Sequence, residues 1–354
     1  MNSKLRDLLL FNIAAVILGL VVSGIMIAIL GHNPLEAYKV LFTAVFRDRY
    51  TFADVFVKAT PFMFSGLAFA FTFKANLFNI GAQGQFYMGA IASVAISLAL
   101  QNTLPGPIVL IFALLGAILL GGLWGSLIGV AKAKRGSNEF LLSMMSTYVA
   151  LNIMNYLLRT VLIESKGEYP QTDPLIRNVW LPSFISKTRL HIGFILAVLT
   201  CIGIWILLYK TGFGYRVRAV GNNSRAAALA GINSDRIYIL SFFIAGGLAS
   251  MAGFTEVNGV QHMLLQGFNP EIGAAGIGIA ILANANPIGI IFASVLFGLL
   301  EVGGVIMGQM MGIPSSIIQL MEGFVMIFVI MSYFFRRKVE KNREIKKLKE
   351  ATND

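Results

Sequence analysis

Residues Asn79–Phe86 read NIGAQGQF and interrupt a region that is otherwise apolar. The residues before them, Phe62–Phe73, read FMFSGLAFAFTF, and those after them, Tyr87–Leu100, read YMGAIASVAISLAL. With its neighbours, each flank approaches the roughly 20 apolar residues that a helix needs to cross a bilayer. The sequence therefore predicts two membrane-spanning helices separated by a polar break.

The composition predicts the same environment for the whole chain. Hydrophobic residues make up 56% of the 354 residues, and charged residues only 13%. Soluble domains carry roughly 25% charged residues because their surfaces face water. Lipid offers no hydrogen bonds to the backbone, which favours helices, and the sequence lacks the short alternating strands of a membrane barrel. We predict an all-α, polytopic membrane protein.

Ten apolar segments predict about ten crossings. Gly273–Ala285 is too short to span alone, which indicates a broken or re-entrant helix pair near the C-terminal end. The first segment is too long for a signal peptide and lacks an obvious cleavage site, so we expect a retained anchor. The segments are Leu8–Leu30, Thr60–Phe78, Ala82–Leu100, Pro107–Ala131, Phe140–Ile163, His191–Tyr209, Ile237–Val260, Gly273–Ala285, Pro287–Met311 and Ser315–Phe335.

The basic residues predict the orientation of these segments. Most of the 28 Lys and Arg residues fall near the N-terminus, around Lys132 and Arg216, and in the tail 336–354. By the positive-inside rule, these parts and both termini lie in the cytoplasm. The net charge of +11 is thus a topology signal, and we expect no nucleic-acid partner. We predict one transmembrane domain over residues 1–335, followed by a basic cytoplasmic tail over residues 336–354.

Two long connections are predicted on the outer side. In Gly31–Ala59, the stretch LEAYKVLFTAVF has apolar residues at helical spacing and is expected to lie along the membrane surface. In Glu164–Leu190, the prolines of YPQTDP favour extended or turn structure. The triplets Gly66-Leu67-Ala68 and Gly247-Leu248-Ala249 lie in spans that would run in opposite directions, which is compatible with an inverted repeat.

The sequence shows no catalytic constellation. Its one cysteine, Cys201, excludes an intrachain disulfide or a cysteine-rich metal site. His32, His191 and His262 lack the spacing of metal ligands, so we expect no metal. No phosphate-binding G-x-x-x-x-G-K-[ST] loop occurs, so ATP would have to be used by a partner subunit. We expect a chain that is not an enzyme and holds no cofactor.

Polar residues inside the predicted spans are the candidate pathway for a solute. Asn79, Gln83 and Gln85 offer donors and acceptors without charge, which matches a neutral polyhydroxy solute. Glycines beside them allow close backbone approach or a helix break, as at many transport sites. The same amides could instead join helices, at about 1 kcal/mol per hydrogen bond. Both interpretations stay open.

Acidic residues in the spans extend this set. Glu256 and Asn258 lie near the outer end of the seventh span, where they either reach the interface or belong to the pathway or its packing. Glu301 and Glu322 lie deeper beside glycines, as proton sites or as acceptors for neighbouring helices. The predicted pathway residues are Asn79, Gln83, Gln85, Glu256 and Asn258.

The cytoplasmic connection 212–236 reads GFGYRVRAVGNNSRAAALAGINSDR. Asn223 or Ser224 suits the N-cap of a short helix, and Gly231 suits the position just past its C-terminus. A short amphipathic helix presented to the cytosol between two spans indicates docking onto another subunit.

Six stretches in a fixed order carry a family resemblance. The chain resembles the permease subunits of ATP-binding-cassette importers in the branched-chain amino acid and simple-sugar permease superfamily, most of all the bacterial nucleoside importers. The likeness covers nearly the whole chain. The stretches are NIGAQGQFYMGA (Asn79–Ala90), SNEFLLSMMSTYVA (Ser137–Ala150), YPQTDP (Tyr169–Pro174), GYRVRAVGNNSRAAALAGI (Gly214–Ile232), AGGLASMAGFTEVNG (Ala245–Gly259) and NPIGIIFASVLFGLLEVGG (Asn286–Gly304).

The resemblance implies a set of partners in the bacterial cytoplasmic membrane. Two permease subunits, a paralogue or a second copy, would form the pathway, while separate ATP-binding subunits use ATP. An extracytoplasmic binding protein or lipoprotein would deliver a nucleoside or a simple sugar, which crosses by alternating access. The stretch Arg218–Gly231 would be the coupling helix, and its predicted contacts are Arg218, Gly221, Asn222, Ala227, Ala228 and Gly231.

The chain departs from the family pattern at a few positions, and one other function class stays open. The family often has Glu where Gln83 stands and Asn where Thr147 stands, and a glycine often precedes the Asn-Pro of ANANP. These differences leave the family resemblance intact, but they leave the identity of the ligand open. The alternative is a proton- or sodium-coupled secondary transporter that titrates Glu301 or Glu322. Only an ATPase-coupled permease needs the connection 212–236, so that segment distinguishes the two.

Overall fold

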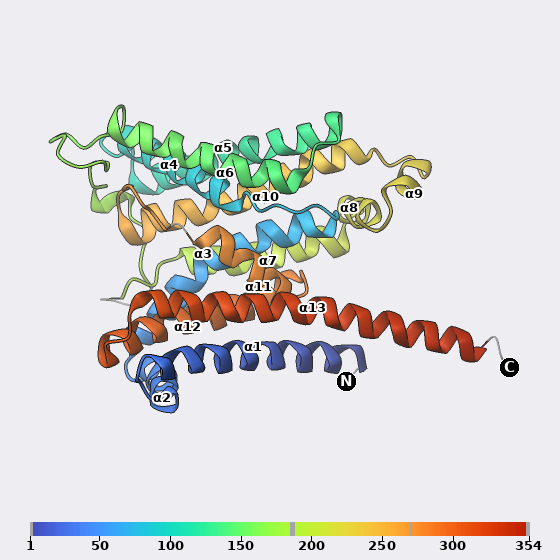
Figure 1. Ribbon diagram of the computed structural model, residues 1–354. Coiled ribbons are helices and arrows are strands. Elements are labelled where there is room, and N and C mark those ends of the chain that lie inside the picture. Colours follow the sequence, from blue (N-terminus) through green and yellow to red (C-terminus); the bar gives the residue numbers. More distant parts are fainter. Residues whose placement is uncertain (1–2, 185–187, 270, 352–354) are drawn as a thin grey trace. The chain divides into compact units, whose positions relative to one another are not determined.

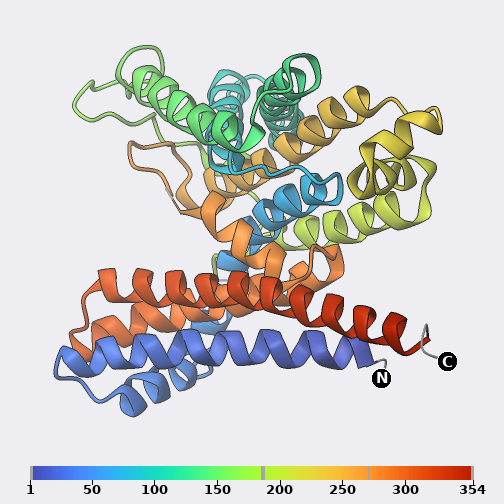
Figure 2. The same cartoon turned by 45° about the vertical axis from the view of Figure 1, so that its right-hand side comes forward.

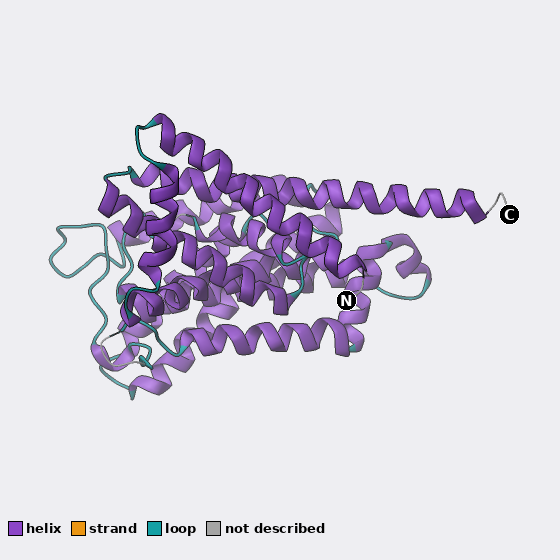
Figure 3. Cartoon of the chain, turned by 90° about the horizontal axis from the view of Figure 1, so that it is seen from below, coloured by secondary structure: helices purple, strands orange, loops and turns teal. Residues whose placement is uncertain are grey.

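The computed structural model describes residues 3–184, 188–269 and 271–351, and within these ranges it consists of helices joined by loops (Figure 3). The predicted all-α fold is confirmed. The helices are α1 (Ser3–Ile29), α2 (Pro34–Val45), α3 (Arg49–Lys74), α4 (Ala82–Leu100), α5 (Gly106–Arg135), α6 (Glu139–Arg159), η1 (Arg177–Val179), α7 (Gly193–Lys210), α8 (Gly212–Asn222), α9 (Ser224–Leu229), α10 (Ser234–Glu256), η2 (Val257–Gln261), α11 (Ile272–Leu282), α12 (Pro287–Met311) and α13 (Ser315–Ala351).

Nine stretches among the described residues are long and apolar enough to cross a membrane. They lie in α1, α3, α4, α5, α6, α7, α10 with η2, α12 and α13. The short apolar helix α11 corresponds to the predicted segment Gly273–Ala285 and is again too short to span. The prediction of about ten crossings, one of them incomplete, therefore agrees with the structure.

The predicted start of the second span is wrong. Helix α3 begins at Arg49 instead of Thr60 and ends at Lys74, and Pro61 lies inside it. The helix start is fixed by Asp48, whose Oδ1 accepts hydrogen bonds from the backbone N–H groups of Tyr50 (2.7 Å) and Thr51 (2.9 Å). This is ordinary N-capping by aspartate. Polar residues in the first turns and the internal proline masked the helix in the sequence.

The chain divides into two units, residues 1–51 with 299–354 and residues 52–298. In the first unit, α1 and α13 run side by side (Figures 1 and 2). They approach so closely that a Cβ on Gly19 would lie 2.6 Å from the Cα of Val325. The expected amphipathic helix in LEAYKVLFTAVF is α2, and the hydroxyl of Tyr38 on it donates to the carbonyl oxygen of Leu20.

Helix α13 continues without interruption past residue 336 to Ala351. The predicted tail is thus helical over its described part, and its last residues, 352–354, lie outside the described residues. The division into a domain 1–335 and a tail 336–354 stays a prediction.

In the second unit, α4, α5 and α10 pack closely together (Figure 1). A Cβ on Gly246 would lie 2.1 Å from the carbonyl oxygen of Gly121, and one on Gly89 would lie 2.5 Å from the Cα of Ser250. Small residues at such crossings let membrane helices meet backbone to backbone, where van der Waals contact replaces the missing hydrophobic driving force. These three helices form the frame that holds the polar stretch 79–86.

Helix α10 leads into irregular structure at its predicted outer end. It widens into the π-helical turn η2, which ends at His262 (φ 58°). The loop after it pairs with the connection 164–190: the backbone N–H of Thr172 donates to the carbonyl oxygen of Leu264 (2.8 Å), and Gln171 bridges to Leu265. The extended or turn structure predicted for YPQTDP is confirmed.

Candidate functional site

Asn79 and Gln85 form a closed pair of amides inside the second unit. The Nδ2 of Asn79 donates to the Oε1 of Gln85 (2.9 Å), and the Nε2 of Gln85 donates to the Oδ1 of Asn79 (3.2 Å). Both side chains are buried. The pair spans the junction between the irregular stretch 75–81 and the first turn of α4, so each amide satisfies the other where no water is available.

Gln83 binds the start of the short helix α11. Its Oε1 accepts from the backbone N–H of Gly273 (2.5 Å), and its Nε2 donates to the carbonyl oxygen of Asn269 (2.9 Å). This site needs a donor and an acceptor on one side chain, which an amide has and an ionised carboxylate lacks. The Gln at this position is therefore explained by the two backbone groups that it bonds.

The structure brings Glu256 and Asn258 into the same region. The Nδ2 of Asn269 donates to the carboxylate of Glu256, so Glu256 and Gln83 share Asn269 as a partner. Asn258 accepts from the hydroxyl of Ser93 (2.5 Å) and donates to Val179 O (3.1 Å) and to the hydroxyl of Ser97 (2.9 Å). All five predicted pathway residues thus bond within the chain in this conformation, and their contact with a solute stays a prediction.

The amide pair makes a testable prediction about stability. Replacing either Asn79 or Gln85 with leucine leaves the other amide buried and unpaired, which costs about 1–3 kcal/mol of unfolding free energy. We expect the double variant to be no less stable than the worse single variant, because it removes both polar groups. Thermal unfolding in detergent measures this, with the exposed Asn102→Leu as control. Additive losses would contradict a closed pair.

Residues 212–229 fold as two helices, α8 and α9, and α10 begins at Ser234. The backbone of Asn223 is extended (φ −159°, ψ 103°) and separates α8 from α9, so the stretch Arg218–Gly231, which the resemblance assigns to one coupling helix, is divided between two helices. The predicted caps are confirmed: the Oδ1 of Asn223 accepts from the N–H of Ala226 (3.0 Å), and Gly231 follows the helix with φ +80°. An Asn that caps one helix cannot also continue the previous one.

The six predicted coupling residues divide into exposed and packed ones. Asn222, Ala228 and Gly231 are exposed. The others are engaged within the chain: a Cβ on Gly221 would lie 2.1 Å from Lys74 O, Ala227 is buried, and the Arg218 guanidinium lies 5.2 Å from the ring centre of Tyr209. The contact of all six with an ATPase stays a prediction.

Sequence reasoning missed Leu229, the last residue of α9. Its side chain is 92% exposed, more than any other large hydrophobic side chain described. A single exposed leucine is common on proteins, but this one ends a helix that is otherwise short and alanine-rich. The only signal of this exposure in the sequence is a leucine in a short alanine-rich helix that has no other large apolar residue to form a buried face with it.

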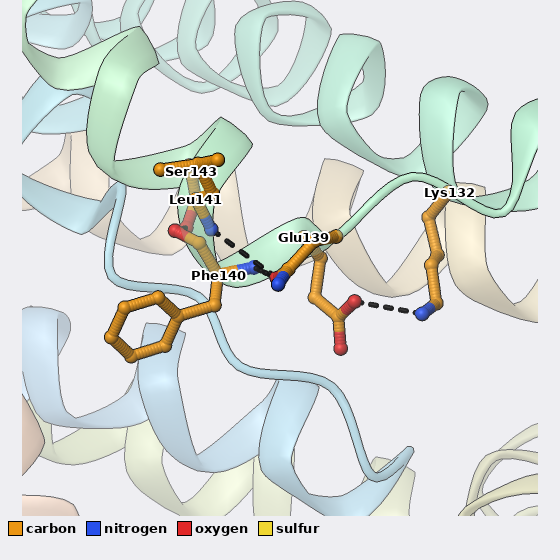
Figure 4. Close-up of polar contacts among 6 residues, drawn as sticks. Lys132, Glu139, Phe140, Leu141 and Ser143 are labelled. Carbon is orange, nitrogen blue, oxygen red and sulfur yellow. Dashed lines mark hydrogen bonds and ion pairs between the residues drawn. The ribbon is translucent and has the colours of Figure 1, made fainter.

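A cleft of about 520 Å³ lies beside α8 and α9. Its walls include Lys132 and Glu139, whose Nζ and Oε2 atoms are 2.8 Å apart and join the end of α5 to the start of α6 (Figure 4). The Oδ1 of Asn138 accepts from the N–H groups of Phe140 (3.0 Å) and Leu141 (3.4 Å), which caps α6. The ion pair and the cap fix the α5–α6 turn, and this turn and the segment α8–α9 line the same cleft.

The comparisons with known proteins agree with this architecture. Residues 51–330 match the family described as branched-chain amino acid transport system / permease component. The chain is 32% identical to the guanosine ABC transporter permease protein NupP of Bacillus subtilis, over 93% of this chain and 94% of that protein. It is 30% identical to the glucose ABC transporter permease protein TsgB13 of Haloferax volcanii, over 92% and 88%. It is 28% identical to the nucleoside ABC transporter permease protein NupB of Lactococcus lactis, over 98% and 97%.

Proposed function

Because this chain belongs to the permease family of branched-chain amino acid transport systems, we propose that it is the membrane subunit of an ATP-driven importer for nucleosides, or for a related simple sugar. The chain is a multi-pass ABC transporter permease. The observation that carries the nucleoside proposal is the 32% identity to a guanosine permease over 93% of the chain.

The proposal includes the way in which energy reaches the pathway. Separate ATP-binding subunits contact the segment α8–α9, and their closure drives alternating access of the membrane helices. The cleft supports this, because residues of α8 and α9 line it together with Lys132 of α5 and Glu139 of α6. A second permease completes the pathway, and a binding protein delivers the solute from outside. Both termini lie in the cytoplasm. The family match leaves the secondary transporter that titrates Glu301 or Glu322 without support.

One purification tests the subunit composition. We expect the tagged chain, extracted from its native membrane in mild detergent, to carry along an ATP-binding subunit and a second permease. The second permease is either a paralogue or an untagged copy of this chain, which co-expression of two differently tagged copies distinguishes. Purification of the chain alone, from membranes that support transport, would contradict the proposal.

Uptake then tests the solute. Cells that contain the complete transporter are expected to accumulate labelled guanosine, and cells that lack this chain are not. Competition by unlabelled nucleosides or by glucose decides between the two solute classes. Accumulation of labelled glucose without accumulation of labelled guanosine would replace the nucleoside with the simple sugar.

A further inference from the structure

Helix α6 differs from the other helices at the surface of its unit. Between Phe140 and Leu158 it holds no charged residue, and it is apolar enough to span a membrane. Yet Tyr148 and Tyr156 are 61% and 65% exposed, and Asn152 between them is exposed as well. These residues are spaced by four, so they share one face of the helix, with Asn155 beside them.

Such a face is poorly suited to lipid. The Nδ2 of Asn152 bonds only back to its own helix, at the carbonyl oxygen of Tyr148 (2.8 Å). The Oδ1 of Asn155 is buried, and no donor among the described residues reaches it. An amide oxygen that is shielded from water and lacks a donor is costly. By contrast, the exposed large side chains are apolar between Ile108 and Leu127 of α5 and between Ile195 and Ile206 of α7, as expected of helix segments that face lipid.

The face lies on a helix that touches the polar stretch 79–86. A Cβ on Gly84 would lie 2.8 Å from the Cα of Thr147, and one on Gly81 would lie 2.9 Å from the carbonyl oxygen of Ser143. The backbone N–H of Ile80 donates to the hydroxyl of Ser143 (3.2 Å). The two glycines therefore seat α6 directly on the start of α4, where the amides Asn79, Gln83 and Gln85 are bonded.

We propose that Tyr148, Asn152, Asn155 and Tyr156 form a binding surface for a neutral nucleoside in the transport pathway. Exposed aromatic rings stack on nucleobases, amides pair with base edges and ribose hydroxyls, and the absence of charge suits an uncharged solute. The surface extends over about 12 Å at 1.5 Å rise per residue, which is about the length of a nucleoside. This inference rests on the proposed function and adds residues that the sequence did not indicate.

Cysteine labelling tests the surface directly. The natural cysteine, Cys201, is buried, so a cysteine introduced at position 152 is the reactive one. A charged thiol reagent reacts with the thiolate, which forms only where water reaches the cysteine. We therefore expect Asn152→Cys in the assembled transporter to be labelled at least about tenfold faster than Leu199→Cys on the apolar face of α7. Saturating guanosine is expected to slow the labelling of Asn152→Cys and leave that of an exposed control, Asn102→Cys, unchanged.

A pair of substitutions at Tyr148 gives a second readout. We expect Tyr148→Ala to raise the KM for guanosine about tenfold, because the variant loses the aromatic ring on which the base would stack. Tyr148→Phe keeps the ring and is expected to keep the KM near that of the unsubstituted chain. Equal KM values for both variants would contradict the stacking role.

The outcomes separate this inference from the proposed function. If the unsubstituted transporter imports guanosine but Asn152→Cys is labelled as slowly as Leu199→Cys, lipid or a partner helix covers the face and the inference is wrong. Labelling without protection by guanosine overturns it too. If the unsubstituted transporter imports neither guanosine nor any other nucleoside, the nucleoside part of the proposed function is wrong, and the nucleoside surface with it.

Discussion

Leu229→Asp is expected to abolish guanosine uptake and to release the ATP-binding subunit during purification. Leu229 ends α9 with its side chain 92% exposed. A leucine buried in a partner contributes about 1.5–3 kcal/mol, and a carboxylate in the same pocket would also have to be desolvated. Because each 1.4 kcal/mol is a factor of ten, we expect at least about a thirtyfold loss of affinity between the two subunits.

The control for this prediction is Leu35→Asp. Leu35 is 80% exposed and lies in the first turn of α2, where a negative charge is tolerated. We expect normal uptake and normal recovery of the ATP-binding subunit from this variant. The measurements are uptake in cells and the amount of ATP-binding subunit recovered per permease. Full uptake by a Leu229→Asp variant present at normal levels in the membrane would show that α9 does not dock.

Leu229 is a better probe than Gly231. Gly231 has φ +80°, a conformation that strains any residue with a Cβ. A substitution such as Gly231→Arg therefore changes the local backbone as well as the surface, and lost transport would not separate the two. The substitution Leu229→Asp changes only an exposed side chain and requires no change of the backbone.

The sequence predicts the helices of this protein well because their signals are local. Apolar runs of spanning length mark most of the spans, and the shortness of Gly273–Ala285 predicts α11. The caps of α9 at Asn223 and Gly231 follow from residue type alone. The start of α3 is missed because its first turns are polar and Pro61 interrupts the expected pattern.

The candidate site is predicted less well, because its contacts are distant in the chain. The sequence marks Asn79, Gln83 and Gln85 as unusual, but it cannot show that Gln83 bonds Gly273, which is 190 residues away. For the same reason, the sequence does not show that the α6 face with Tyr148, Asn152 and Tyr156 is exposed. Tyrosine and asparagine at helical spacing are compatible with a buried seam, and only the packing of α6 on Gly81 and Gly84 shows which face stays open.

The second large effect is expected at Gly121, on the face of α5 that meets α10. A Cβ on Gly121 would lie 1.4 Å from the hydroxyl oxygen of Ser250 and 2.8 Å from the carbonyl oxygen of Gly246. The Ser250 hydroxyl donates to that same carbonyl (2.7 Å), so moving it aside breaks a buried hydrogen bond. The carbonyl belongs to the backbone and has no rotamer by which to move. Substitution therefore forces α5 and α10 apart.

We expect Gly121→Val to destabilise the folded protein by about 3 kcal/mol or more, at the upper end of the usual cost of overpacking. Gly203→Val is the matched control, since Gly203 also lies inside a spanning helix but has open space around it. Valine is a slightly better helix former than glycine, so the control is expected to unfold at the same temperature as the unsubstituted protein or above it. Thermal unfolding in detergent compares the two. The two substitutions change helix propensity equally, so the difference in stability between the two variants measures the contact of α5 with α10. Equal stabilities would mean that these helices are not packed as closely as the structure shows.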